Sequence, residues 1–247
     1  MMDRRQLLAG LGAGLALTGC EKIGSTGPAQ DILYSADRFT LGAMRLVTDR
    51  TALAREYSES EMSPIFRANG SRTGSTPEWE RHAADDFQGW RLDVGGLVAR
   101  PLSLSRAELM AMPRRVQITR HDCVEGWSAI GKWHGVPLRL VLERVGLSDR
   151  ARYILFRCGD ELGGMPYYET IDLVEAFHPQ TILACGMNGG MLPVQHGAPL
   201  RLRTERQLGY KHAKFVMGIE AIDSFANIRG GQGGYWEDRG YDWWAGI

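Results

Sequence analysis

The residues best suited to chemistry lie in one short segment, residues 120–133, and Cys123 is near its start. Cys123 follows Arg120 and His121, and nearby positive charge favours the thiolate form of a cysteine. A thiolate serves either as a nucleophile or as a metal ligand. The nucleophilic role needs a histidine as general base, and the candidates are His121, His134 and His196. A third alternative is a buried cysteine that only fills space, which the polar, tryptophan-rich surroundings disfavour.

A second group of reactive side chains is basic and lies between residues 201 and 214. It contains one anion, Glu205, and five cations, Arg201, Arg203, Arg206, Lys211 and Lys214. A terminal phosphate is held well by a fork of arginine donors together with the point charge of a lysine. The stretch therefore predicts a phosphate-binding segment, and the alternative is a solvated cationic face of a strand.

Other side chains have two interpretations each. Glu125, two positions after Cys123, is a candidate proton donor, or it only orders the loop. Cys158 and Cys185 lie inside apolar runs and are expected to be small core residues. The aromatic residues between positions 235 and 244 form either core or a wall around a substrate entrance.

Short strands and helices are expected to position these residues. Alternating or continuous apolar runs predict strands at residues 90–94, 116–118, 153–156, 181–184, 199–203 and 215–219. Capping residues and breakers predict short helices that start at Ser105, at Pro137 and at Asp172. Residues 120–135 are predicted to be a loop, Asn188-Gly189 a hairpin turn, and residues 31–89 mostly irregular. This mixed order, without an internal repeat, predicts a single α+β domain with several strands, short helices and long loops.

The amino-acid composition restricts the class of protein to which the chain can belong. The chain has 247 residues, 29 basic and 29 acidic, and 44% of its residues are hydrophobic. These values fit one soluble globular domain, or two small ones. They exclude a global positive charge that would attract nucleic acid, and they also exclude a polytopic membrane protein and a disordered chain. Four cysteines without a CxxC pair exclude a disulfide scaffold and a paired-cysteine zinc site.

The first residues form an export signal. Arg4-Arg5 precedes an apolar run, residues 7–17, that is too short to span a membrane. The pair indicates the twin-arginine route, which exports folded chains and so indicates a cofactor. Residues 17–20 resemble a bacterial lipobox, which would make Cys20 a lipid acceptor; the alternative is a soluble secreted protein. We therefore expect a signal peptide at residues 1–19, a tether at 20–30, the domain at 31–247, and a periplasmic or cell-envelope location.

One motif resembles a known family. Residues 123–128, Cys-Val-Glu-Gly-Trp-Ser, followed by Trp133-x-Gly135-Val136-Pro137-Leu138, are similar to the molybdenum-ligand segment of the sulfite oxidase superfamily. The resemblance is closest to the exported bacterial branch that includes the periplasmic protein-methionine-sulfoxide reductase. Further matching motifs lie at residues 90–96, 187–189, 196–202, 209–214 and 234–241, so the resemblance covers about residues 64–247.

The resemblance implies one molybdenum-molybdopterin cofactor (Mo-pyranopterin) and roles for individual residues. Cys123 would supply the protein thiolate to molybdenum, which suits a soft, redox-active metal. The matching positions that would contact the pterin or its phosphate are Asn69, His196, Arg201, His212, Ala213 and Lys214. Cys158 falls near a further cofactor-contacting position at which the family usually has a threonine.

The implied reaction is oxygen-atom transfer on a small sulfur-containing or related substrate, in a direction that stays open. The motif at Cys123, and a chain that ends soon after the cofactor domain, favour a sulfoxide reductase over a sulfite dehydrogenase. A histidine at position 196 where the reductase has asparagine, the tryptophan-rich tail and the lipobox depart from the reductase pattern. No haem motif is present, so electrons would be exchanged with a separate partner, a membrane b-type cytochrome or a soluble cytochrome. A hydrolase that uses Cys123 and a histidine, and a cofactor-binding protein without turnover, are the alternatives from other classes.

Overall fold

The computed structural model describes residues 39–247. The expected signal peptide and Cys20 lie outside the described residues. Residue contacts divide the chain into two units, residues 1–49 and 50–247, and the second unit contains every other candidate site residue. In the first unit, residues 39–47 are helical. Across residues 39–247, none of the helices combines the length and the apolar character needed to cross a membrane.

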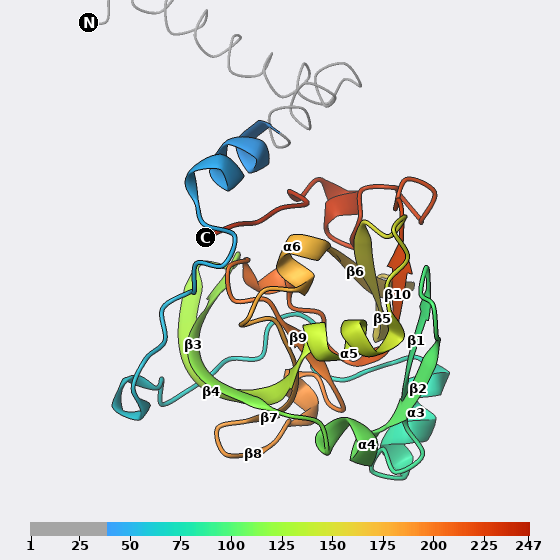
Figure 1. Ribbon diagram of the computed structural model, residues 1–247. Helices are drawn as coiled ribbons and strands as arrows, with labels where there is room; N and C mark the ends of the chain where they lie inside the picture. Colours follow the sequence, from blue (N-terminus) through green and yellow to red (C-terminus); the bar gives the residue numbers. More distant parts are fainter. Residues whose placement is uncertain (1–38) are drawn as a thin grey trace, which may run out of the picture. The chain divides into compact units, whose positions relative to one another are not determined.

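Two five-stranded sheets form the framework of the second unit (Figure 1). In the first sheet the strand order is β2-β1-β10-β5-β6, and only β1 and β10 run parallel. Its strands are β1 (Arg91–Gly96), β2 (Leu102–Ser105), β5 (Tyr153–Leu162), β6 (Met165–Asp172) and β10 (Val216–Ile222). In the second sheet the order is β3-β4-β7-β8, β9 also pairs with β7, and all pairs are antiparallel. Its strands are β3 (Arg115–Cys123), β4 (Trp127–Pro137), β7 (Ile182–Met187), β8 (Gly190–Met191) and β9 (Arg201–Arg203).

Short helices connect and cover the sheets, and their ends follow local capping chemistry. The α-helices are α3 (Pro77–Ala84), α4 (Arg106–Met110), α5 (Leu138–Val145) and α6 (Leu173–Ala176). The 3₁₀ helices are η1 (Glu59–Glu61), η2 (Val194–His196), η3 (Gly209–Lys211) and η4 (Glu237–Arg239). Ser105 and Glu108 form the predicted capping box of α4. Gly146, with a positive φ, ends α5 as predicted.

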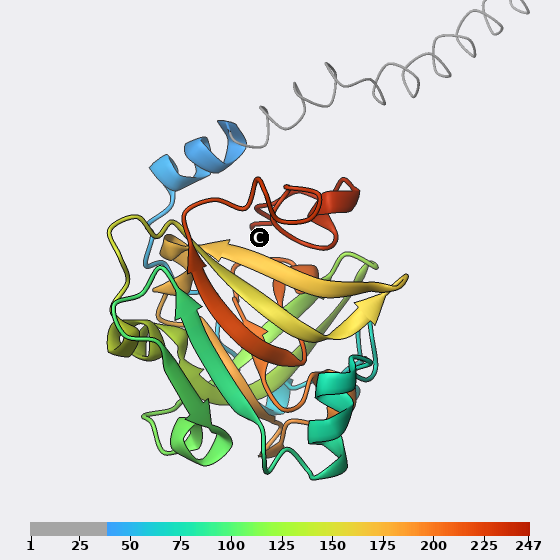
Figure 2. The same cartoon turned by 90° about the vertical axis from the view of Figure 1, so that its right-hand side faces the viewer.

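One hydrophobic core joins the two sheets. It contains Leu92 of β1 and Phe156 of β5 from the first sheet, Leu183 of β7 from the second, and the buried face of α5. The C-terminal segment, residues 225–247, lies at the β6 end of the first sheet (Figure 2), where Gly234 forms a bridge with Glu169.

The predicted mixed α+β fold is confirmed, and three details of the prediction are wrong. Residues 120–135 are not a loop: β3 continues to Cys123 and β4 begins at Trp127, so the two strands form a hairpin. Alternate residues of β3 are buried, but several of them are polar and hide the apolar pattern. Strand β6 was not predicted because Glu169, Thr170 and Asp172 are among its buried positions, so its buried residues do not form an apolar pattern. Helix α3 escaped because Trp79 is its one buried residue, so it has no apolar stripe.

Candidate functional site

A pocket of about 650 Å³, counted out to its open mouth, lies where β3 ends and η3 begins. Five of the residues singled out in the sequence line it: Asn69, Cys123, Glu125, His212 and Lys214. They come from parts of the chain more than 140 positions apart, and the fold brings them to one cavity. Arg201 and His196 adjoin this set, since Arg201 bonds both the backbone of His196 and the side chain of Asn69.

Cys123 is the last residue of β3 and is 8% exposed. Gly126 has a φ of +85°, a value that glycine adopts without strain, and its N–H donates to the Cys123 carbonyl at 3.0 Å. Burial raises the pKa of the Cys123 thiol, while the N–H of Glu125 and the charge of Arg201 counteract the rise. The Glu125 carboxylate accepts a 2.9 Å hydrogen bond from Trp127 Nε1 and is exposed at the turn.

Arg201, on β9, is a fully buried cation, and among residues 39–247 no carboxylate oxygen lies within 4.0 Å of it. Its guanidinium donates to the His196 carbonyl at 3.1 Å and to Asn69 Oδ1 at 3.0 Å, and Nε has no partner in the part of the chain that the structure describes. The guanidinium carbon also lies 5.3 Å from the ring centre of Trp133. Burial, together with the charge of Arg203, lowers the pKa of Arg201 to about 9. Such a charge is stabilised when an anion binds beside it.

Lys214 is a second buried cation without an ion pair in the described part of the chain. Its Nζ donates to three backbone carbonyls, those of Asn69 at 2.6 Å, Ser71, and Gln195 at 3.3 Å. Asp160 also lines the pocket, and burial raises its pKa to about 6. Lys214 bonds the backbone carbonyl of Asn69 and Arg201 bonds its side chain, so both cations contact the same residue.

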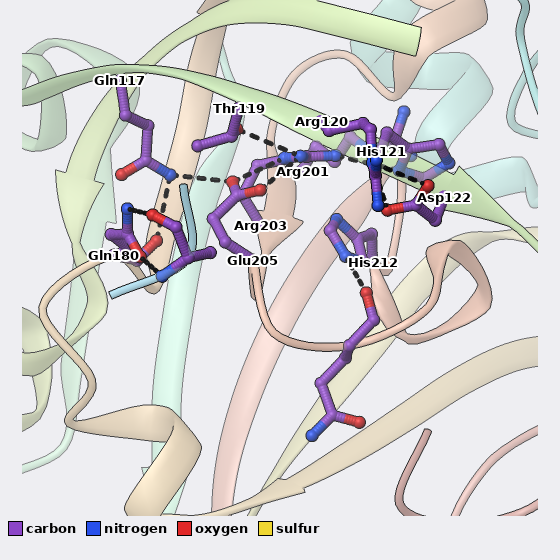
Figure 3. A network of polar contacts seen from close by, with 12 residues as sticks. Gln117, Thr119, Arg120, His121, Asp122, Gln180, Arg201, Arg203, Glu205 and His212 are labelled. Atoms are coloured by element: carbon purple, nitrogen blue, oxygen red, sulfur yellow. Dashed lines mark hydrogen bonds and ion pairs between the residues drawn. The ribbon is translucent and has the colours of Figure 1, made fainter. Parts of the chain in front are cut away.

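The other three cations of the basic stretch have carboxylate partners. Arg203 pairs with Glu205 at 2.5 Å, and both side chains are fully buried. Figure 3 shows this pair within a wider network, in which Gln117 donates to Glu205 and Arg203 donates to His121 Nδ1 at 3.0 Å. Arg206 pairs with Glu175, and Lys211 pairs with both Glu169 and Glu237. Of the five cations in this stretch, Arg201 and Lys214 therefore remain available to bind a phosphate.

Three buried histidines stand near the pocket. Burial lowers the pKa of His121 and His212 well below the usual range, and lowers that of His196 to about 4. His212 donates from Nε2 to the Gln207 carbonyl at 3.0 Å, which leaves Nδ1 as an acceptor. All three imidazoles are therefore neutral at pH 7.

Four residues that the resemblance assigned to the cofactor do not line the pocket: His196 and Arg201, which adjoin it, and Cys158 and Ala213. Cys158, on β5, is buried opposite Val216, and burial raises its pKa well above the usual value. Ala213 uses its backbone within the protein: its N–H donates to Lys211, and its carbonyl accepts from Leu202.

Sequence reasoning missed several lining residues. Asp160 was not singled out because it lies within a mostly buried strand. Tyr167 was not singled out because its strand, β6, was not predicted. Tyr210 follows Gly209 in a motif that drew attention for its cations alone. The aromatic tail was singled out but left undecided, and Trp236 and Tyr241 of this tail line the pocket.

The residues present fit a phosphate-bearing pterin. The buried polar atoms without a hydrogen-bond partner within the described residues include four at or beside the pocket: Arg201 Nε, His196 Nδ1, His212 Nδ1 and Asp160 Oδ1. Buried polar atoms without partners are rare and call for a bound group. Arg201 would donate to a phosphate, and Asp160 would accept from the N–H groups of a pterin. Within residues 39–247, no group of three or more His, Cys, Asp or Glu side chains is placed to hold a metal ion by itself.

Comparisons with known proteins agree with this chemistry. The family described as oxidoreductase molybdopterin binding domain matches residues 79–227. A putative protein-methionine-sulfoxide reductase subunit YedZ1 from Azospira oryzae is 38% identical over 245 residues, which cover 99% of this chain and 86% of the relative. The protein-methionine-sulfoxide reductase catalytic subunit MsrP from Xanthomonas axonopodis pv. citri is 30% identical over 236 residues, 90% of this chain and 70% of the relative.

A solved structure is similar in fold. The sulfane dehydrogenase SoxCD from Paracoccus pantotrophus superposes with a TM-score of 0.51 at 22% identity, over 56% of this chain and 39% of that chain. The family match, the two relatives and the pocket with its buried cations lead to the same conclusion. The chain belongs to the molybdopterin-binding oxidoreductases of the sulfite oxidase superfamily.

Proposed function

We propose that this chain is the catalytic subunit of an exported reductase that converts sulfoxides, methionine sulfoxide above all, into thioethers. The observation that carries the proposal is the pocket that Cys123 shares with Lys214, next to which Arg201 bonds the lining residue Asn69. Within residues 39–247 neither of these two buried cations forms an ion pair with a carboxylate. The names of two relatives, which are 38% and 30% identical, support the sulfoxide as substrate.

The chain's own residues divide the binding of the cofactor among them. Cys123 supplies one thiolate to molybdenum, and Arg201 and Lys214 hold the phosphate. Asn69, which bonds both cations, keeps their spacing fixed. His196 and His212 present neutral ring nitrogens that have no partner among residues 39–247 and that could accept hydrogen bonds from the pterin.

When bound, the cofactor supplies a redox-active molybdenum centre for oxygen-atom transfer. The overall reaction consumes one sulfoxide, two electrons and two protons, and it yields one thioether and one water. Glu125 is the candidate proton donor to the substrate, because it lines the pocket and its carboxylate is oriented by Trp127 Nε1.

Two alternatives have less support. Sulfite oxidation has no comparable support, because the sulfane dehydrogenase SoxCD is similar in fold alone. For a cysteine hydrolase, no histidine within residues 39–247 forms a hydrogen bond with Cys123 Sγ, and burial raises rather than lowers the thiol pKa.

Export and anchoring also belong to this proposal. Arg4-Arg5 would direct the folded chain through the twin-arginine route, and Cys20 would carry the lipid. A b-type or soluble cytochrome would deliver the electrons. Replacing Cys20 with alanine should move the protein from the membrane fraction to the soluble fraction of the cell envelope, while an unchanged distribution would refute the anchor.

The test of the reaction uses purified holoprotein with a reduced viologen as electron donor. We expect reduction of methionine sulfoxide, and slow or no oxidation of sulfite with an electron acceptor. Cys123→Ser should abolish turnover, whereas Cys185→Ser, a buried cysteine outside the pocket, should retain it. If the Cys123→Ser variant bound molybdenum and kept the full activity of the wild type, the proposal would be refuted.

A further inference from the structure

The pocket lining separates into a polar group and an aromatic group. Asn69, Asp160 and Lys214 belong to the polar group, which is linked through hydrogen bonds and charge. The aromatic group is an unbroken chain of ring contacts. Tyr210 meets Tyr241 edge-on at 5.1 Å between ring centroids, and Tyr241 meets Trp236 at 5.2 Å.

The aromatic group is held in place by the C-terminal segment rather than lying loose at the surface. Glu237, next to Trp236, forms a fully buried ion pair with Lys211 at 2.5 Å. The Tyr210 hydroxyl donates to the Asp242 carbonyl at 2.7 Å, one residue after Tyr241. Both pocket-lining aromatics of the tail are therefore fixed by neighbours in the chain.

The hydroxyl groups of two pocket-lining tyrosines, Tyr210 and Tyr167, are already used within the protein. Tyr210 donates to Asp242, and Tyr167 donates to the Tyr210 carbonyl at 2.7 Å. Tyr210 therefore offers a ligand its ring rather than its hydroxyl.

Such a wall distinguishes between the substrates of oxygen-atom transfer at sulfur. Methyl and thioether groups pack favourably against aromatic rings. Sulfite is a small, strongly hydrated dianion that gains nothing from ring contacts and loses hydration in an apolar site. Because the polar group of the lining is suited to the cofactor, the aromatic group is left for the organic part of the substrate.

We propose that Tyr210, Trp236 and Tyr241 form a substrate-selecting wall that favours sulfoxides with an apolar alkyl chain over sulfite and other small oxyanions. This inference rests on the proposed sulfoxide reductase function and names the residues that choose its substrate. The wall acts on substrate binding and takes no part in breaking the sulfur–oxygen bond.

The test compares Trp236→Ala with the wild-type holoprotein. KM for methionine sulfoxide should rise about tenfold while kcat stays within about twofold, because ring contacts of this kind contribute about one factor of ten to binding. KM for dimethyl sulfoxide, which lacks the longer chain, should rise less. Trp244→Ala is the matched control, since Trp244 lies in the same segment but does not line the pocket.

A second readout does not depend on turnover. The affinity of the oxidised holoprotein for methionine sulfone, a close analogue of the sulfoxide, should fall about tenfold in Trp236→Ala and stay unchanged in Trp244→Ala. Cofactor content per chain is measured first, and Tyr241→Leu replaces Trp236→Ala if that content falls.

The two proposals fail in different ways. If the wall variant keeps both the KM and the sulfone affinity of the wild type, the wall is not a selecting element, although sulfoxide reduction stands. If the wild-type holoprotein reduces no sulfoxide, the proposed function is wrong, and the sulfone affinities alone then decide whether the wall binds apolar ligands.

Discussion

Arg201 and Arg203 lie two residues apart on β9, are both fully buried, and should respond oppositely to the same substitution. Arg201 has no carboxylate partner in the described part of the chain, whereas Arg203 pairs with Glu205. Replacing each with methionine keeps most of the side-chain volume and removes the charge. The comparison therefore isolates the effect of an uncompensated buried charge.

The magnitude for Arg201→Met follows from its pKa. A fall from 12.5 to about 9 corresponds to about 5 kcal/mol by which the folded, cofactor-free protein disfavours the charge. The substitution also removes two hydrogen bonds of about 1 kcal/mol each and a ring contact with Trp133 of about 1–2 kcal/mol. We therefore expect the free energy of unfolding of cofactor-free Arg201→Met to stay equal or to rise by up to about 2 kcal/mol.

Arg203→Met should lower the same free energy by about 3–5 kcal/mol, because Glu205 is left buried without its cation. Urea unfolding of protein produced without the cofactor measures both values. In protein produced with the cofactor, Arg201→Met should retain little of it, because truncating one side of a buried charge pair weakens binding by about 2–5 kcal/mol. Equal destabilisation of the cofactor-free protein by the two substitutions would refute the reasoning.

Three further predictions concern other parts of the fold. Burial, with the charge of Arg206, lowers the pKa of His178 to about 4, so the unfolded chain binds the proton more tightly. Between pH 6.5 and 4 the wild type should lose up to about 3 kcal/mol of unfolding free energy relative to His178→Gln, and parallel pH curves would contradict this. Gly197→Ala should lower the cofactor content per chain, because φ is +114° and a Cβ would lie 2.9 Å from Cβ of Lys214; wild-type content would count against it. Lys211→Met should destabilise by about 3–5 kcal/mol in urea unfolding, because two buried carboxylates lose their cation, and a loss below about 1 kcal/mol would disagree.

The sequence allowed much of the fold to be predicted, and the errors have a common cause. Strands and helices with an apolar face were found, as at α5 and β7. The hairpin around Cys123 was taken for a loop because its inward positions carry polar side chains that serve the site. Sequence periodicity detects burial in a hydrophobic core, and it fails where the buried surface surrounds a polar pocket.

The candidate site shows a similar limit. The basic stretch was visible, but its ion pairs were not, because Glu175 and Glu169 lie about 30 and 40 positions from the cations that they neutralise. The pair of Arg203 and Glu205, two positions apart, could have been predicted from strand geometry. Which cations remain available to a ligand depends on tertiary contacts that composition does not encode.

The short helix η3 has a consequence for redesign of this enzyme. Tyr210 belongs to the proposed substrate wall, Lys211 pairs with Glu237 of the C-terminal segment, and His212, the residue after η3, lines the pocket. Transplanting the C-terminal segment of a relative to change substrate preference would therefore have to preserve an acid at position 237. Without that acid, the graft would leave Lys211 of η3 with one carboxylate partner fewer, next to His212, which we propose contacts the cofactor.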